Sequence, residues 1–343
     1  MPAMSEPNPA AAPALTPHPH APPAFAGTLV LVNLGTPQAP TAPAVRDYLD
    51  EFLTDPRVVS IPGVLWKPLL RGLILPLRSP RSAEKYARIW LEGGSPLSVY
   101  THGLAAQVHA LLPGWRVLPA MRYGQPALRT LLHRLQGEGA PLRVLPLYPQ
   151  YSTTTTASVQ DVVREVFPNA TAPQLTWVED YSDDPDWIAA VADSIAQWRQ
   201  ANGAGQHLLF SFHGLPQRVA NNGDPYPQRC QRSAALIAQA LGLAADAWTL
   251  TYQSRFGKER WLQPATDAEL KAMAGRGLHL VDVVCPGFAV DCLETLEEVG
   301  MQFAEGFAHA GGTLRYIPCL NDSPAHARAL VAMLERQFGP MQA

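Results

Sequence analysis

The stretch LLFSFHGLP (208–216) places a histidine at the end of an apolar run. Gly214 and Pro216 end that run at once, so the imidazole of His213 lies at the carboxyl edge of a predicted strand. A neutral imidazole in such a place can accept a proton or bind a metal ion near pH 7. Two interpretations stay open: a core histidine satisfied by the backbone, or a histidine that belongs to a site.

A group of carboxylates follows in DCLETLEEVG (291–300). On an α-helix, Asp291, Glu294 and Glu298 share one face, because they are spaced by three and then four residues. The preceding CPGFAVD reads as a strand-end loop, so this acidic stripe starts where ligands bind. We therefore expect a path for a cation, with a solvated acidic first turn as the alternative.

Aromatic and basic residues recur at other predicted strand ends. They are Arg122 and Tyr123, Tyr148 and Tyr151, and Tyr252 and Arg255. Aromatic rings stack on planar ligands, and guanidinium groups bind carboxylates in a bidentate manner. Together they predict a large, flat ligand that carries carboxylates. Because the chain has neither GxGxxG nor a Walker A motif, nucleotide binding has little support.

Short apolar runs alternate with amphipathic stretches along the chain. The predicted strands are 28–35, 116–124, 142–152, 174–181, 207–214, 248–254, 278–288 and 313–321, and the helices between them include 127–137, 186–199 and 292–307. This alternation is typical of parallel sheets covered on both faces. We expect an α/β fold of two similar Rossmann-like domains, each a doubly wound, parallel four-stranded sheet, with an interdomain active-site cleft at the strand ends.

Residues 1–24 are dominated by Pro and Ala and are predicted to be a disordered tail. The first domain is expected at 25–170, completed by a C-terminal helix at 324–338. The second domain, with the histidine and the glutamates, is expected at 171–323. Pro and Asn residues cluster at 168–173, where the domains are predicted to meet.

The composition of the 343 residues, 47% hydrophobic and 16% charged, is that of a globular protein. A net charge of −3 argues against a nucleic-acid partner. Four widely spaced cysteines without a CxxC pair predict a reduced, cytoplasmic protein. The tail lacks the features of a secretory signal, and no stretch of eighteen apolar residues occurs, so we expect no membrane span.

The stretch VLWKPLLRGLILPLR (64–78) is amphipathic and basic. Pro68 and Pro76 are expected to limit a regular helix there. One interpretation is a helix that covers the core. The other is an apolar lip that admits an apolar ligand or makes peripheral contact with the inner face of a membrane.

Six motifs, in the same order, resemble the ferrochelatase family, whose members insert ferrous iron into protoporphyrin IX. They are LVNLGTP (31–37), RIWLEGGSPL (88–97), LPLYPQYS (145–152), LLFSFHGLPQRVANNGDPY (208–226), YQSRFGKERWLQPATD (252–267) and CPGFAVDCLETLEEVG (285–300). The resemblance spans roughly residues 27–335. It implies a lyase that releases two protons and forms protohaem in the last step of haem biosynthesis, within two Rossmann-like domains.

The resemblance implies that His213 and Glu294 are the catalytic pair and that Glu298 extends the acidic path. With Asp291 of the predicted stripe, these residues are the expected metal ligands. The positions that match the porphyrin pocket are Leu34, Arg78, Tyr86, Ser95, Arg122, Tyr123, Tyr151 and Trp261. The chain departs from some members at Cys292, where they have a histidine, and the effect on metal choice is open.

Fe²⁺ and protoporphyrin IX are the expected substrates of a monomer with no tightly bound cofactor. Some members bind a [2Fe–2S] cluster through cysteines in a C-terminal extension; no cysteine follows Cys319 here, so no such cluster is expected. The alternatives are a chelatase for another tetrapyrrole or metal, such as coproporphyrin or cobalt, and a non-enzymatic haem- or porphyrin-binding protein. Whether His213 first meets the iron or the departing protons stays open.

Overall fold

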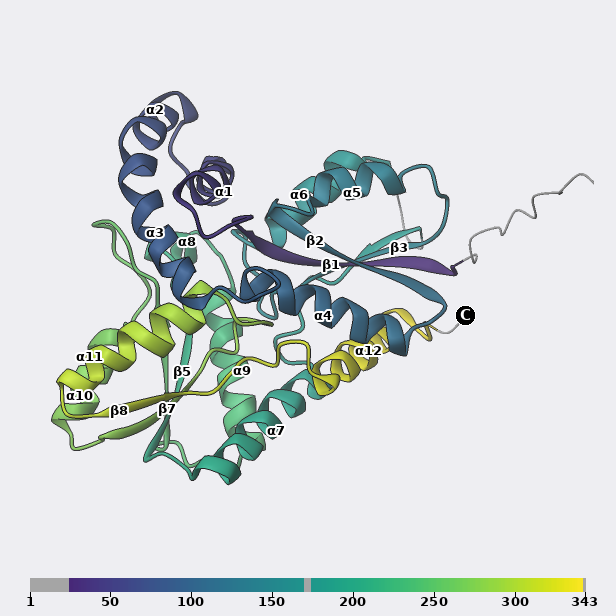
Figure 1. The fold of residues 1–343 in the computed structure, drawn as a ribbon. Helices are drawn as coiled ribbons and strands as arrows, with labels where there is room; N and C mark the ends of the chain where they lie inside the picture. The colour runs from purple at the N-terminus through teal and green to yellow at the C-terminus, as the bar shows by residue number, and fades with distance from the viewer. Residues whose placement is uncertain (1–24, 170–173, 342–343) are drawn as a thin grey trace, which may run out of the picture.

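The computed structural model describes residues 25–169 and 174–341 (Figure 1). The predicted tail and most of the predicted domain junction therefore lie outside the described residues. Eight strands form two four-stranded sheets, and every neighbouring pair is parallel. Helices cover the sheets, which confirms the α/β fold class (Figure 1).

The two sheets have the same strand order. The first runs β2-β1-β3-β4, with bounds β1 (Gly27–Thr36), β2 (Trp115–Gly124), β3 (Leu142–Pro146) and β4 (Leu175–Trp177). The second runs β6-β5-β7-β8, with bounds β5 (His207–His213), β6 (Trp248–Gln253), β7 (Leu280–Val284) and β8 (Thr313–Tyr316). In each unit the first strand of the chain is central, so the second unit repeats the topology of the first.

All eight predicted strands are present, but several are shorter than predicted. The strand predicted over 142–152 ends at Pro146, and the one predicted over 278–288 ends at Val284, two residues before Pro286. Proline has no N–H to donate to a neighbouring strand, so pairing stops near it. The apolar residues beyond these points belong to loops at the carboxyl edge.

The helices lie on both faces of each sheet. In the first unit they are α1 (Ala42–Thr54), α2 (Gly63–Leu69), η1 (Leu70–Ile74), α3 (Leu75–Ile89), α4 (Pro96–Leu111), α5 (Leu128–Leu135) and α6 (Thr156–Val166). In the rest of the chain they are α7 (Pro185–Asn202), α8 (Gln217–Asn221), α9 (Tyr226–Ala240), α10 (Thr266–Gly275), η2 (Glu294–Phe303), α11 (Ala304–His309) and α12 (Pro324–Phe338). The last helix, α12, packs against both α4 and α7, between the two units (Figure 1).

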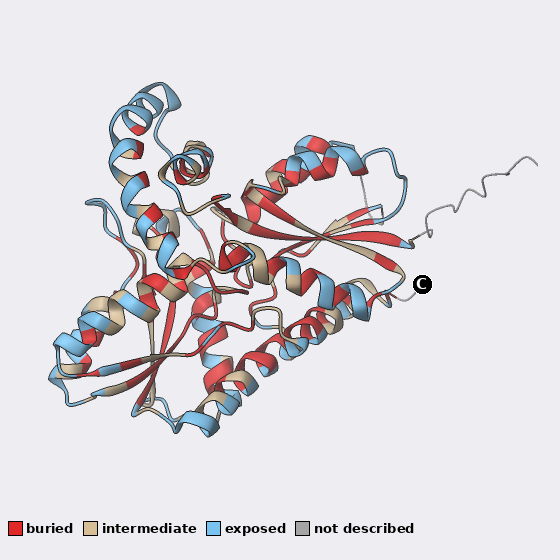
Figure 2. Cartoon of the chain, in the orientation of Figure 1, coloured by how far each residue is buried: buried red, intermediate tan, exposed pale blue. Residues whose placement is uncertain are grey.

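One apolar cluster spans both units. Alternate side chains of β1 point to opposite faces, so Leu29 and Leu31 join one cluster while Val30 and Val32 join another. The first of these clusters continues through α4, α12, α7 and α9 to the second sheet, where it contains Leu208, Phe210 and Phe212 of β5. Figure 2 shows this buried interior running between the sheets. The two units therefore share this cluster, in addition to an apolar cluster that belongs to each unit alone.

The segment α2–η1–α3 projects from the first unit as a nearly continuous helical arm (Figure 1). The prolines limit regular α-helix here, as predicted, although the chain stays helical throughout. A π-helical stretch accommodates them: the N–H of Leu75 donates to the carbonyl of Leu70, and Pro76 follows without a donor to satisfy. The inner face of the arm is buried against α1 through residues that include Leu70 and Leu75.

The outer face of this arm is apolar and open to solvent (Figure 2). Its exposed side chains are Val64 (81%), Leu65 (68%), Leu69 (47%), Leu73 (53%) and Leu77 (59%). Contiguous apolar surface of this kind marks a contact with a membrane, a partner or an apolar ligand. Among the residues described here, no helix has the length and apolarity needed to cross a membrane.

A buried charge in β7 provides a test of the second unit's framework. The Asp282 carboxylate is fully buried and accepts from Arg199 at 2.8 Å and Arg315 at 2.6 Å. Asp282→Asn removes the charge that both guanidinium groups face, and we expect a loss of about 3 kcal/mol in unfolding free energy. Urea denaturation measures it. Glu165→Gln, in an exposed pair with Arg129, should leave the midpoint unchanged.

Candidate active site

His213 is the last residue of β5, and its half-buried ring lies at the carboxyl edge of the second sheet. Its Nδ1 is 2.7 Å from the carbonyl oxygen of Gly214. Because a carbonyl can only accept, Nδ1 carries the proton of the neutral ring and the lone pair is on Nε2. The backbone therefore orients the imidazole through one nitrogen, and the other nitrogen keeps the capacity to act as a base or a ligand.

The glycine after the histidine is required by the neighbouring strand. A Cβ at Gly214 would lie 2.7 Å from the carbonyl oxygen of Gln253 and 3.2 Å from a ring carbon of Trp261. Gly35 in β1 is in the same situation, with φ +122° and a Cβ position 1.8 Å from the carbonyl oxygen of Tyr123. Both glycines let an edge strand approach the end of the central strand.

Gln253 connects the two strand ends to the helix that carries the glutamates. It is the register partner of His213 on β6 and is buried. Its Nε2 donates to the backbone oxygen of Glu294 at 2.8 Å, and its Oε1 accepts from Ser211 Oγ at 2.6 Å. Sequence reasoning quoted this strand end but assigned Gln253 no role. Its place near the carboxyl end of the strand predicted over 248–254 was the available signal.

Both glutamates lie on a π-helix, η2 (Glu294–Phe303), and not on the α-helix predicted over 292–307. In a π-helix each N–H donates to the carbonyl five residues earlier, which makes a wider turn, and such stretches are frequent at functional sites. Only the last part of the predicted helix, α11, is α-helical. Apolar spacing alone does not separate these two helix types, so the sequence pattern could not predict this.

The prediction that Asp291 shares a helical face with Glu294 and Glu298 is wrong, because the helix begins after it. The Asp291 carboxylate is buried and accepts from Thr295 Oγ1 at 2.8 Å, from Asn321 Nδ2 at 2.7 Å and from the hydroxyl of Tyr316. These bonds fasten the start of η2 to the segment after β8. Asp291 therefore lies before the helix of the two glutamates, with its carboxylate held by neighbouring donors.

Glu298 lies beside His213 and accepts two hydrogen bonds from Ser254. The Ser254 N–H donates at 2.9 Å and its hydroxyl donates as well, from a backbone with φ 64°. Burial raises the pKa of Glu298, and the charge of Glu294 raises it further. The Ser254 hydrogen bonds and the charge of His213 act in the opposite direction and lower this pKa. The net result is a carboxyl group that binds a proton more readily than an exposed glutamate does.

The two glutamates face different surroundings. Glu294 lies toward the first unit, where its charge adds to burial, the larger cause, in raising the pKa of Tyr86 on α3 and of Tyr48 on α1. Glu298 instead lines a cavity of about 450 Å³ together with Ser254, Trp261 and Asp267. Successive carboxylates on η2 therefore connect the cavity to the space beside α3.

Residues of α3 and of the loop after β6 meet across the gap between the units. The guanidinium of Arg78 lies 5.4 Å from the ring centroid of Phe256, and Phe256 packs 4.9 Å from the ring of Trp261. Trp261 is buried, and its Nε1 donates to the Phe256 carbonyl at 3.0 Å. Leu34 and Tyr86 pack in the apolar cluster under the arm. Four predicted pocket residues thus border the site from both sides.

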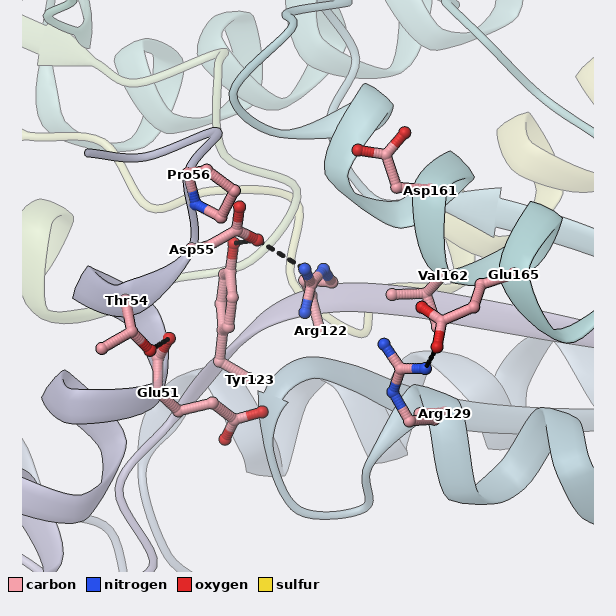
Figure 3. A pocket seen from close by; sticks show the side chains of 10 residues that line it. All are labelled: Glu51, Thr54, Asp55, Pro56, Arg122, Tyr123, Arg129, Asp161, Val162 and Glu165. Atoms are coloured by element: carbon pink, nitrogen blue, oxygen red, sulfur yellow. Dashed lines mark hydrogen bonds and ion pairs between the residues drawn. The ribbon is translucent and has the colours of Figure 1, made fainter. Parts of the chain in front are cut away.

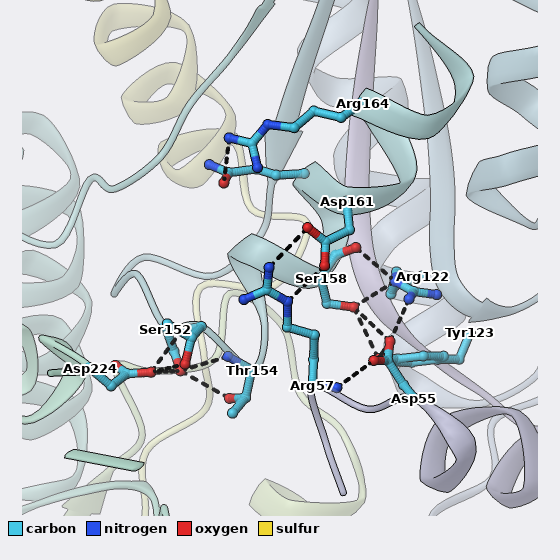
Figure 4. Close-up of polar contacts among 12 residues, drawn as sticks. Asp55, Arg57, Arg122, Tyr123, Ser152, Thr154, Ser158, Asp161, Arg164 and Asp224 are labelled. Atoms are coloured by element: carbon cyan, nitrogen blue, oxygen red, sulfur yellow. Dashed lines mark hydrogen bonds and ion pairs between the residues drawn. The ribbon is translucent and has the colours of Figure 1, made fainter. Parts of the chain in front are cut away.

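Arg122 and Tyr123 belong to a buried polar network of the first unit (Figures 3 and 4). The Tyr123 hydroxyl donates to Asp55 Oδ2 at 2.8 Å, and Arg122 Nη2 donates to the same oxygen at 2.5 Å. Arg122 Nε also donates to Ser158 Oγ at 2.7 Å. Two of its nitrogens, Nε and Nη2, therefore donate within the protein, beside a separate cavity of about 270 Å³. The Tyr123 ring itself packs in the apolar cluster that also contains Leu34 and Tyr86.

Two further predicted pocket residues make structural contacts. Ser95 is buried at the start of α4, where its hydroxyl accepts from the Ser98 N–H at 3.2 Å and caps the helix. Tyr151 is half-buried at the carboxyl edge of the first sheet, and its N–H donates to Asp180 at 2.8 Å. Within the described residues, neither Ser95 nor Tyr151 forms a hydrogen bond with a glutamate of η2.

Within residues 25–169 and 174–341, no three His, Cys, Asp or Glu side chains are arranged as a preformed metal site. His213 and the two glutamates therefore provide successive nitrogen and oxygen donors without a closed coordination sphere. Cys292, the departure noted in the sequence, is buried directly before η2, and burial raises the pKa of its thiol. A protonated thiol is a poor metal ligand.

Comparison with known proteins agrees with these features. The model of the ferrochelatase family matches residues 27–338. The chain is 62% identical to the ferrochelatase of Stenotrophomonas maltophilia (strain R551-3) over 306 residues, 89% of this chain and 96% of that protein. It is 60% identical to the ferrochelatase of Xylella fastidiosa (strain M12) over 309 residues, 90% of this chain and 97% of that protein. With the Vibrio cholerae ferrochelatase the identity is 48% over 311 residues, covering 90% and 97%.

The match extends over nearly the whole length of these relatives and includes the strand ends, the arm and the π-helix described above. The chain therefore belongs to the ferrochelatase family and is a metal chelatase of the lyase class that serves haem biosynthesis.

Proposed function

We propose that this enzyme inserts Fe²⁺ into protoporphyrin IX, releasing two protons and forming protohaem, in the cleft between the two units. The observation that carries the proposal is the convergence of His213, Glu294 and Glu298 at one strand edge, opposite Arg78 and Tyr86 of the arm. It combines proton acceptors, donors for an iron ion and an apolar wall in one place.

Metalation removes two pyrrole N–H protons and turns the nitrogen lone pairs toward the incoming ion. The Nε2 of His213 is the first proton acceptor in this proposal, because Nδ1 is held by the Gly214 carbonyl. A glutamate of η2 accepts the second proton, and the raised pKa of Glu298 suits it to hold a proton and pass it to water in the adjoining cavity. Both protons thus leave on the side of the second unit.

The first unit, together with Trp261 of the second, holds the macrocycle in this proposal. Arg78 supplies a guanidinium for a propionate, while Leu34, Tyr86 and Trp261 supply apolar surface. Binding energy from these contacts bends the ring, so that its nitrogen lone pairs tilt out of the plane toward His213. The shared core between the units supports this role, since it resists the opening that a flat ring would impose.

Iron reaches the ring along the carboxylates of η2, from Glu298 at the cavity to Glu294 at the cleft. Carboxylate and imidazole are acceptable ligands for Fe²⁺, and donors that do not enclose the ion let it move on. Asp291 is left out of this path because its oxygens are already engaged. The proposal needs no resident cofactor.

The enzyme acts, in this proposal, as a cytoplasmic monomer that touches the inner face of a membrane through residues 64–78. The exposed leucines of α2 and α3 would enter the headgroup region, and Lys67 lies among them to meet anionic lipid. This surface borders the arm that holds the porphyrin. An apolar substrate could therefore pass between lipid and cleft without crossing water.

The reaction itself is tested by mixing the purified chain with Fe²⁺ and protoporphyrin under anaerobic conditions and following the absorbance of the product. We expect turnover by the wild type and a loss of at least about 100-fold in His213→Ala, because the proton acceptor at the ring is gone. Porphyrin binding, followed by fluorescence, should stay largely intact.

The matched control is His207→Ala, at the opposite end of the same strand, which should keep full turnover. Retained insertion by His213→Ala contradicts the assignment. Faster turnover of coproporphyrin, or of Co²⁺, would select the alternative chelatase. Tight porphyrin binding by a wild type that never metalates it would select a binding protein.

Glu298→Gln should raise the apparent KM for metal several-fold and lower kcat for bound metal much less, because Glu294 remains on η2 to accept the second proton. Metal binding requires the deprotonated carboxylate. Since the pKa of Glu298 is raised, the KM for metal in the wild type should fall as the pH rises through this raised value. The glutamine variant should lack that part of the pH dependence. Glu305→Gln, exposed on α11, is the control, and equal pH profiles for both variants would remove Glu298 from the path.

Membrane contact is tested by co-sedimentation with vesicles of phosphatidylethanolamine and phosphatidylglycerol. Replacing Leu65 and Leu77 together by glutamine should lower the bound fraction roughly ten-fold, because two exposed apolar side chains no longer enter the lipid. Leu111→Gln, which changes an exposed leucine on α4, should bind like the wild type. Binding that the double variant keeps would show that the lipid contact lies elsewhere.

A further inference from the structure

The π-helix η2 carries a third glutamate, Glu297, which the proposed reaction does not use. Its side chain is only 1% exposed, whereas Glu294 and Glu298 beside it are half-buried. Removing a carboxylate from water is costly unless charges or donors compensate it. The charge at this position therefore has a specific set of partners.

Those partners come mainly from the other unit. Lys85 Nζ lies 3.2 Å from Glu297 Oε2, and Arg88 Nη1 lies 3.6 Å from Oε1. Gln302 on η2 itself donates to Oε2. No donor within the described residues makes a hydrogen bond to Oε1, so the charge of Arg88 is its closest compensation. Lys85 and Arg88 are three residues apart, which places both on one face of α3.

This contact joins the two helices that border the cleft. On α3, Lys85 directly precedes Tyr86, and Arg78 lies two turns earlier. On η2, Glu297 lies between the two glutamates of the proposed metal path. Leu293 and Leu296 also pack against the apolar cluster of α1 and α3. Apolar packing is non-directional and permits sliding or rotation, while paired charges of defined geometry oppose both.

We propose that Glu297 is a positioning residue whose contacts with Lys85 and Arg88 fix the π-helix against α3, and so set the place of Glu294 relative to a porphyrin held by the arm. This inference rests on the proposed function. It predicts that loss of the charge leaves both substrates bound but misplaces the carboxylate at the ring, and misplacement by about 1 Å is enough to lower a rate strongly.

The test uses Glu297→Gln, which keeps the size of the side chain and removes its charge. We expect kcat for iron insertion to fall roughly ten-fold, with the KM for porphyrin changed by no more than about two-fold. Lys85→Gln should lower kcat in the same way, while Lys85→Arg should keep it. Because one contact is broken in each case, the double variant should be no slower than Glu297→Gln alone.

Asp282→Asn is the matched control, since it also removes a buried carboxylate charge with two arginine partners, but in β7 and away from the cleft. Assayed at a temperature where circular dichroism shows all variants folded, it should keep the wild-type kcat. An unchanged kcat in Glu297→Gln, or losses that add in the double variant, overturns the proposal.

A second measurement is independent of turnover. The native cysteines are buried, so spin labels attach selectively to cysteines introduced by Ala87→Cys on α3 and Met301→Cys on η2, both exposed positions. The distance distribution between them should broaden or shift in Glu297→Gln and not in Asp282→Asn. An unchanged distribution overturns the proposed positioning role of Glu297. A wild type that does not metalate porphyrin would overturn the proposed function, and these distances would still decide the role of Glu297.

Discussion

The placement of every reactive group in this protein depends on the apolar cluster that runs from the first sheet to the second. It combines alternate residues of β1 and β5 with faces of α4, α7, α9 and α12. Parallel strands present their carboxyl ends at one edge, and a shared core fixes how the two edges face each other. Without this shared cluster, the cleft would depend on a small and polar interface between the units, and its width would vary.

The pKa of a carboxyl group in the cleft depends on this fixed arrangement of the two sheet edges. A carboxyl group with a raised pKa needs burial, and Glu298 obtains it from the loop after β6 and from its neighbours on η2. The same wall holds Ser254, whose two hydrogen bonds to Glu298 oppose this rise in its pKa. Opposing effects of this kind leave a group able both to bind a proton and to meet a cation, which is what exchange of protons for metal requires.

Much of the arrangement was accessible from the sequence. Continuous apolar runs that alternate with amphipathic stretches predicted all eight strands and the parallel sheets, and Gly214 with Pro216 placed His213 at its edge. What the pattern could not provide was geometry that depends on distant partners. Apolar spacing is shared by α- and π-helices, so the start of η2 and the separation of Asp291 from the glutamates were missed. Arg122 carried the right chemistry for a carboxylate ligand, but Asp55, far away in sequence, is its partner.

The repeated strand order has one more consequence. Leu34, Gly35 and Pro37 at the end of β1 stand where His213, Gly214 and Pro216 stand at the end of β5, and each glycine admits the neighbouring edge strand. The two halves thus present topologically equivalent positions to the cleft, one aliphatic and one basic. In the proposed reaction, a planar porphyrin between them has two unlike faces, and only the face toward the imidazole is open to proton loss and metal entry. Two identical halves would make its faces equal, so the proposed direction of insertion depends on the divergence at this single pair of positions.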